Sequence, residues 1–353
     1  MTAAMKTTLT HGRVLPGAFA LGHILLALLL CSSAWAAQPY RDIRKAIGAG
    51  PLYPAQPETL VNTLYRLYEG AAKRPEGQKM AACIVPHSAY GLSGKVAAQA
   101  FAQLSPGDYK RVVVLGASTA TSFQGCSVPS VDAFQTPLGY VPVDKKAVEM
   151  VTRSSLFSTR SVRYRPSEQH PPLHEIEPSI ELTLPFLQER LGNFSLVPIV
   201  VGDLRDADNK LSDAVYLNVA ESIGSILDEN TLLVVTAEFT HFGAEFKYTP
   251  FADNILPNIK QLDDEVFQTV INRDFPAFHA YLERTKNPLV GVEGLGVLMK
   301  LLTSGVKGTL LGYDTSGQLL KTPNHSVSYA SFGFYYPTPT PAPTAPPPEP
   351  AKP

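Results

Sequence analysis

Two histidines follow apolar segments that we expect to be strands, and both could do chemistry. His87 follows Ile84 and Val85 and precedes a turn rich in serine and glycine. His241 follows the apolar run 232–237 in a similar setting. Because open α/β sheets place ligand crevices at the carboxyl ends of strands, both imidazoles are candidate metal ligands or acid/base groups. The alternative is that each histidine hydrogen-bonds a neighbouring loop and only shapes the crevice.

Hydroxyl groups accompany the first histidine and the next apolar segment. Tyr90 comes three residues after His87, where a phenol would donate a proton or simply line the pocket. Thr119, Thr121 and Ser122 follow a Gly-Ala-Ser sequence at the end of an expected strand. Backbone amides and hydroxyls in such a turn can cradle an anionic group, and the alternative is an ordinary polar turn.

Further histidines and cysteines are weaker candidates. His170 and His174 lie in a segment rich in histidine, glutamate and proline, which could overhang the pocket and supply ligands or an acid, or could be a solvated loop. Cys126 is a candidate nucleophile only if a histidine lowers its pKa. Cys83 lies in an apparently buried strand, so we expect core packing rather than a disulfide between these two cysteines.

The body of the chain alternates apolar, β-branched runs with segments of helical period. This alternation favours a mostly parallel central sheet with helices on both faces, in a single α/β domain over 37–336. Two runs near the end, 308–313 and 326–335, are expected to be adjacent antiparallel strands. The expected earlier strands are 83–85, 111–115, 195–201 and 232–236, and the expected helices are 95–104, 178–191, 206–227, 263–272 and 293–304.

The first 36 residues are typical of a cleavable signal peptide. A weakly basic start precedes the apolar run 24–30, and small residues stand at 34 and 36. The run is too short for a permanent membrane helix, so contact with the membrane is expected only through this segment. We expect cleavage after Ala36 and an exported, periplasmic protein, with an uncleaved anchor as the alternative.

The C-terminal segment predicts a disordered tail, and the net charge of the chain argues against one class of function. Residues 337–353 are rich in proline and predict a disordered, extended tail that either is only solvated or docks on a partner. The 353-residue chain has 30 Lys and Arg against 31 Asp and Glu, a net charge of −1. This balance argues against nucleic-acid binding, which needs clustered positive charge.

Several sequence blocks, in a fixed order over about residues 40–336, resemble the Memo-like proteins, whose bacterial members are called AmmeMemoRadiSam system protein B. The first is Gly50-Pro51-Leu52-Tyr53-Pro54, and the second is Pro86-His87-Ser88-Ala89-Tyr90. The later blocks are Leu115-Gly116-Ala117-Ser118, Thr136-Pro137-Leu138-Gly139, Glu177-Pro178-Ser179-Ile180-Glu181, Glu238-Phe239-Thr240-His241-Phe242-Gly243 and Ser326-Val327-Ser328-Tyr329-Ala330. The resemblance implies a fold similar to that of the class III extradiol dioxygenases.

The resemblance also implies a pocket that binds iron or copper in some members, and this chain departs from the ligand set. His87 matches the first ligand, but Thr119 and Val290 stand where the other two, a histidine and a cysteine, are expected. Valine cannot coordinate a metal, and a threonine hydroxyl is a poor ligand for a soft or borderline one. His241 and Glu238 would complete a two-histidine, one-carboxylate set only if their side chains converge with His87. We therefore expect a degenerate metal site and no cofactor, with iron or copper as the alternative.

Two classes of function follow from these expectations. The first is a metal-free protein that binds an unknown small molecule or peptide. The second is an enzyme, either a metal-dependent, dioxygenase-like oxidoreductase or a hydrolase that uses His87 and His241 as acid and base. Tyr90 and Glu238 are the further pocket candidates under both hypotheses.

Overall fold

A computed structural model describes the chain from Tyr40 to Pro337 with short interruptions. The described residues are 40–159, 162, 171–206, 208, 210 and 212–337. The predicted signal segment 1–36, the tail beyond 337 and His170 lie outside them. All helices and strands named below belong to one compact unit that begins at Asp42.

Four parallel strands form the centre of the main sheet, in the order β2 (Met80–Val85), β9 (Thr231–Thr236), β3 (Arg111–Ala117) and β8 (Ser195–Val201). Every residue of β2 and β9 is buried. Their continuous apolar sequences fit this position, because a parallel strand covered on both faces needs apolar side chains on both. The expected strands are confirmed here, with β2 beginning three residues earlier than predicted.

Antiparallel strands extend both sides of this parallel centre. Strand β12 (Ser326–Tyr335) pairs with β2, with β11 (Lys307–Thr315) and with β10 (His241–Phe242). At the other side, β4 (Cys126–Ser127) runs antiparallel to β8 and parallel to β7 (Phe157–Ser158). The antiparallel pair near the end of the chain is therefore confirmed, and the whole sheet is mixed rather than purely parallel.

A second, three-stranded sheet was not predicted. It consists of β1 (Ile43–Arg44), β5 (Ala133–Thr136) and β6 (Gly139–Pro142). Strands of only two to four residues are too short to show an alternation of apolar and polar residues, so tertiary contacts must specify them. One such contact is the buried ion pair of Arg44 with Glu181, which fixes β1 against the segment before α6.

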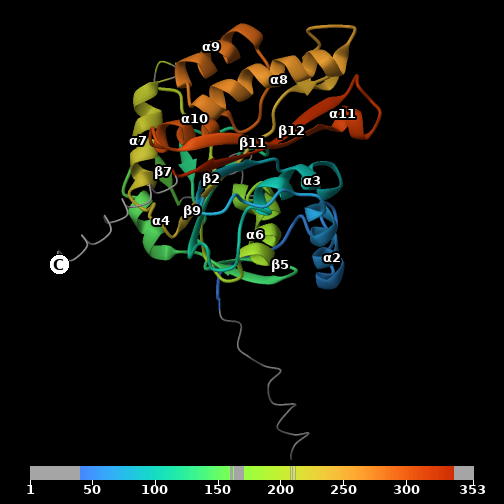
Figure 1. Ribbon diagram of the computed structural model, residues 1–353. Coiled ribbons are helices and arrows are strands. Elements are labelled where there is room, and N and C mark those ends of the chain that lie inside the picture. Colours follow the sequence, from blue (N-terminus) through green and yellow to red (C-terminus); the bar gives the residue numbers. More distant parts are fainter. Residues whose placement is uncertain are drawn as a thin grey trace, which may run out of the picture. The chain divides into compact units, whose positions relative to one another are not determined.

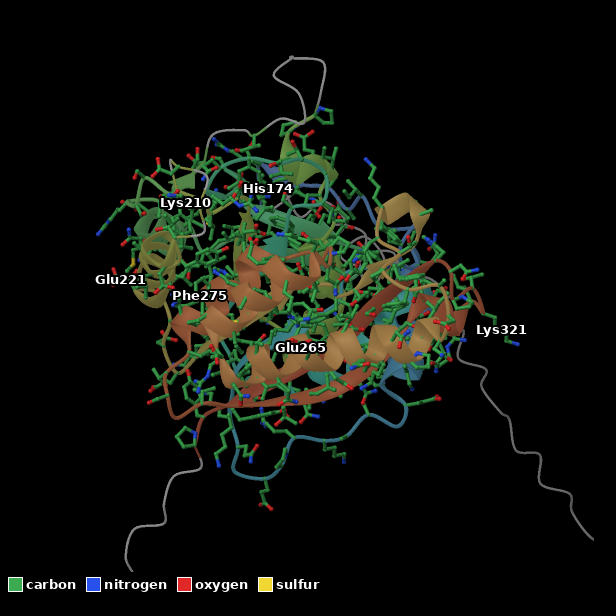
Figure 2. All side chains as sticks on the ribbon, turned by 90° about the horizontal axis from the view of Figure 1, so that it is seen from above. His174, Lys210, Glu221, Glu265, Phe275 and Lys321 are labelled. Atoms are coloured by element: carbon green, nitrogen blue, oxygen red, sulfur yellow. The ribbon has the colours of Figure 1, made fainter. Side chains whose placement is uncertain are left out.

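Helices cover both faces of the main sheet (Figure 1). Helices α7, α8, α9 and α10 lie on one side, and α2, α3 and α6 lie on the other. Glu265 on α8 and Phe275 at the start of α9 mark the first group in Figure 2. The helix bounds are α2 Pro57–Tyr68, α3 Tyr90–Phe101, α4 Lys145–Val151, α5 Leu173–Ile176, η1 Glu181–Thr183, α6 Leu184–Leu191, α7 Asp213–Gly224, η2 Ala244–Phe246, α8 Ile255–Asn272, α9 Phe275–Thr285, α10 Val292–Leu301 and α11 Ser316–Leu319.

The topology brings the loops that carry the sequence candidates to one edge of the sheet. Strands β2, β9 and β3 are parallel neighbours, so their carboxyl ends share an edge. His87 follows the end of β2, Thr119 follows β3, and Glu238 and His241 follow β9. None of the helices in the described part of the chain has the length and hydrophobicity needed to span a membrane.

Candidate functional site

Glu238 joins the loops that carry the two candidate histidines. One carboxylate oxygen, Oε1, accepts a hydrogen bond from the backbone N–H of His87 at 3.3 Å. The other, Oε2, lies 3.7 Å from Nε2 of His241. All three residues are buried, with 6, 6 and 8% of their surface exposed for His87, Glu238 and His241. The two predicted loops therefore meet, and a carboxylate lies at their junction.

The hydrogen bonds of His241 determine which ring nitrogen carries a hydrogen. Its Nδ1 lies 2.7 Å from the carbonyl oxygen of Phe239, which can only accept, so Nδ1 is the donor. In the neutral ring Nε2 is then an acceptor that faces Glu238 Oε2. The distance of 3.7 Å between these two acceptors is too long for a direct hydrogen bond. They interact favourably only when one of them carries a proton or when a solvent molecule bridges them.

Opposing influences act on the charge of His241. Burial lowers the pKa of His241 below its usual value, the negative Glu238 raises it, and the neighbouring His87 lowers it again. The ring of His87 adds a buried Nδ1 that has no hydrogen-bond partner among the described residues. A cluster of this kind can accept or release a proton, which is the property required of an acid/base group.

Thr119 is engaged with a carboxylate from the same chain. Its backbone N–H and its hydroxyl both donate to Glu177 Oε2, at 2.6 and 2.8 Å, and the N–H of Ala120 donates to the same oxygen at 3.1 Å. The other oxygen accepts from the N–H of Ser179 at 3.0 Å. The turn after β3 binds an anionic group, which is one of the two alternatives that its sequence left open, and that group is Glu177.

The residues at the implied metal-ligand positions do not fit a metal. The Thr119 hydroxyl donates to Glu177, and the Val290 side chain has no donor atom. The backbone of Val290 pairs with that of Glu238 in both directions, at 3.0 and 2.9 Å. Within the described ranges, no group of three or more His, Cys, Asp and Glu is arranged to hold a metal ion. The implied set is thus reduced to His87, with Glu238 between it and His241.

Tyr90 lies in the core rather than at this cluster. Its hydroxyl donates to the carbonyl oxygen of Leu182 at 2.8 Å. Its ring packs between Tyr53 and Phe186, with centroid distances of 5.3 and 4.7 Å. Burial raises its pKa well above the usual value for a phenol. Tyr90 therefore lies outside the candidate site.

The two altered ligand positions line one cavity. It has a volume of about 400 Å³ and lies at the carboxyl edge of β3 and β8, next to the start of α10. Val201, Leu289 and Val290 supply apolar surface. The polar lining consists of Ser118, Thr119, Thr121, Ser122, Asp203, Arg205 and Glu293. A largely polar cavity of this size can hold a small molecule.

Three carboxylates around this cavity were missed from the sequence. Glu177 lies at the end of the loop rich in histidine and glutamate, and Glu293 lies in a segment of helical period; in both settings an acidic residue is typical of a solvated surface. Asp203 follows β8, and its place after a buried apolar run is the same signal that singled out the two histidines. That rule, applied to every strand, would have found Asp203.

The remaining candidates lie elsewhere. Cys83 and Cys126 are free and buried, and burial raises the pKa of Cys83 to about 12 and that of Cys126 further, the opposite of an activated thiol. His174 lines a different cavity, of about 520 Å³, together with Arg44, and its Nε2 lies 3.1 Å from Ser127 Oγ. It therefore supplies no ligand to the His87 cluster.

Sequence comparisons place the chain in a family. The family described as Memo-like protein matches residues 44–333. Protein MEMO1 of Homo sapiens is 27% identical over 299 residues, covering 82% of this chain and 96% of that protein. The MEMO1 family protein of Thermococcus onnurineus is 26% identical over 304 residues, covering 83 and 99%. Because the family match spans most of the chain, the chain belongs to the Memo family.

Proposed function

We propose that this protein is an exported member of the Memo family that binds a small molecule without a metal ion. The binding site is the 400 Å³ cavity between the 118–122 turn and α10. The observation that carries the proposal is that Thr119 and Val290, the two altered ligand positions, both line this cavity. A cavity is present at these two positions, and neither side chain is one that would hold a metal.

The surroundings of the cavity support binding over metal chemistry. The turn is fixed by the bonds to Glu177, so the wall is built before any ligand arrives. Preorganisation of this kind lowers the entropic cost of binding. The lining is more polar than that of most small-molecule sites, so it suits a polar ligand with a short apolar part.

A cavity-filling variant tests the proposal. The exported protein, purified without chelator, is first assayed for iron, copper and zinc, and then screened for small molecules that raise its unfolding temperature. We expect far less than one metal ion per chain, and ligands whose effect disappears in Val290→Phe because the ring occupies the cavity. Val131→Phe, the same change in the 520 Å³ cavity, is the control and should retain the response. Stoichiometric metal in wild type, or ligands insensitive to Val290→Phe, would overturn the proposal.

A second candidate function is metal-independent hydrolysis, which the 3.7 Å approach of His241 to Glu238 favours. In this reaction His241 would act as the base towards a water molecule, with Glu238 holding the resulting imidazolium. His241→Gln should then abolish turnover of a hydrolysed ligand while the protein stays folded. If both His87→Ala and His241→Gln change only the unfolding temperature, the histidines are structural.

The proposed location is the periplasm, after cleavage behind Ala36. A short apolar segment followed by small residues supports it. The protein recovered from the periplasmic fraction should begin at Ala37 when its N-terminus is sequenced. A chain that begins at Met1 in the membrane fraction would instead indicate an uncleaved anchor. In the periplasm, the proline-rich tail from 337 would be available to a partner.

A further inference from the structure

More negatively than positively charged side chains line the proposed cavity. Asp203 and Glu293 contribute two carboxylates, and Arg205 contributes one guanidinium. Asp203 Oδ1 accepts the backbone N–H of Arg205 at 2.9 Å, which leaves its second oxygen free of described partners. No salt bridge joins Arg205 to either carboxylate among the described residues. The lining therefore has an excess of negative charge that Arg205 compensates only in part.

The two carboxylates act on each other and on a buried phenol. Burial raises the pKa of Glu293 and the charge of Asp203 raises it further, while a backbone hydrogen bond and the charge of Arg205 oppose the shift without cancelling it. The hydroxyl of Tyr216 on α7 is buried without a hydrogen-bond partner in the described chain. Burial is the main cause that raises the pKa of Tyr216, and the charges of Glu293 and Asp203 raise it further. A positive group between these carboxylates would relieve their repulsion.

The same cavity is poorly suited to an anion. Backbone amides are the usual anion-binding groups in a turn after a strand, and here those of Thr119 and Ala120 already donate to Glu177. Arg205 is the remaining cation in the lining, and it is an exposed residue. It can meet a negatively charged end of a ligand only where that end reaches solvent.

We propose that the cavity binds a small aliphatic ammonium compound, with the ammonium group between Asp203 and Glu293 and any carboxylate end towards Arg205. This inference rests on the proposed binding function and names its ligand class. Ammonium groups donate charge-assisted hydrogen bonds to carboxylates, and such bonds are stronger than neutral ones. The apolar surface of Val201, Leu289 and Val290 suits a short aliphatic chain.

Four compounds with the same four-carbon chain separate charge from shape. They are putrescine, 4-aminobutanoate, 1,4-butanediol and succinate, titrated against the full exported protein by calorimetry. We expect both amines to bind at least about tenfold more tightly than the diol or the diacid. Arg205→Gln should weaken 4-aminobutanoate and leave putrescine unchanged or tighter, because only the former carries a carboxylate.

Isosteric variants locate the ammonium group. Asp203→Asn and Glu293→Gln should each weaken both amines by about tenfold or more, with circular dichroism confirming that each variant is folded. Glu149→Gln makes the same change at an exposed position on α4 and should bind as wild type does. Binding of succinate in preference to the amines, or amine binding that survives both cavity variants, would overturn the inference.

The two proposals fail in different ways. If neither amine binds but a screened compound does, and Val290→Phe removes that binding, then the ammonium inference is wrong and the binding function stands. If nothing binds in a manner sensitive to Val290→Phe, both are wrong.

Discussion

At the scale of single residues, one carboxylate decides the character of the turn after β3. Glu177 receives hydrogen bonds from two backbone amides and one hydroxyl of Thr119 and Ala120, and from the amide of Ser179. It is 2% exposed. The turn has the amide pattern of an anion site, and an internal anion satisfies it. A sequence shows the amides but not what reaches them, so it left open whether this turn binds an anion or is an ordinary polar turn.

Replacing this carboxylate should loosen the turn. In Glu177→Gln an amide NH₂ would face N–H donors, so we expect a loss of about 1.5–3 kcal/mol of unfolding free energy, measured by urea titration. Glu175→Gln, two residues away at an exposed position, should change it by less than about 0.5 kcal/mol. Equal small losses in both variants would contradict a structural role for Glu177. Hydrogen exchange at 119–120 should also rise only in Glu177→Gln.

At the scale of elements, α8 positions the loop that carries Glu238 and His241. Asp263 on α8 is 0% exposed and accepts hydrogen bonds from the amide and hydroxyl of Thr240, at 3.2 and 2.6 Å, and from the hydroxyl of Tyr313 at 2.8 Å. Asn287 donates to the same Thr240 hydroxyl at 2.7 Å. Helix, loop and β11 are thus joined by one buried polar network.

Neighbouring aspartates on this helix offer a matched test. Burial raises the pKa of Asp263, and the bonds it accepts oppose that effect. Asp263→Asn should lose about 2–3 kcal/mol of unfolding free energy, because its NH₂ would face donors in a buried site. Asp264→Asn removes only an exposed ion pair with Lys260 and should cost about 0.5 kcal/mol or less. If the two variants unfold at the same urea concentration, the network does not fix the loop.

Element boundaries show where sequence patterns are insufficient. Helix α3 begins at Tyr90, five residues before the predicted start, although Gly91 and Gly94 look like a loop. A Cβ on Gly94 would lie 2.9 Å from Leu67 Cδ1, so this glycine allows α2 and α3 to pack closely. Helix α9 has a start that can be read from the sequence, in which the Asp274 side chain accepts a hydrogen bond from the N–H of Ala277.

At the scale of the whole molecule, a half-buried histidine links distant parts of the chain. His174, which is labelled in Figure 2, lies beside Ser127 on β4. The backbone carbonyl oxygen of His174 accepts a hydrogen bond from Nε of Arg44 on β1 at 2.7 Å. Burial lowers the pKa of His174 to about 3, and the charge of Arg44 adds to the effect. The folded state therefore holds this ring neutral at a pH where the unfolded chain would protonate it.

This difference predicts how stability depends on pH. Because the folded pKa lies below the unfolded value of about 6.5, the unfolded chain binds the proton first, and stability falls as pH drops from about 6.5 towards 3. The loss due to this one group approaches about 1.4 kcal/mol per pH unit. His174→Gln removes the titration, so urea unfolding between pH 7 and 4 should give a shallower decline than in wild type. Parallel declines would mean that His174 does not titrate in this way.

The sequence by itself determined the parallel strands β2, β3, β8 and β9, because a continuous run of β-branched apolar residues is typical of a strand that is buried on both faces. It also determined that histidines stand at the carboxyl ends of two of these strands, since that depends only on order along the chain. The order of the sequence blocks carried the family resemblance, and the family comparison confirmed it.

Only the tertiary structure decided which partners the candidate residues have. Glu238 lies between His87 and His241, the amide of Thr119 donates to Glu177, and Tyr90 is buried against Phe186. These contacts join residues up to 151 positions apart. Local patterns encode periodicity and burial, whereas contacts over such separations depend on how the helices and strands pack, and no short segment carries that information.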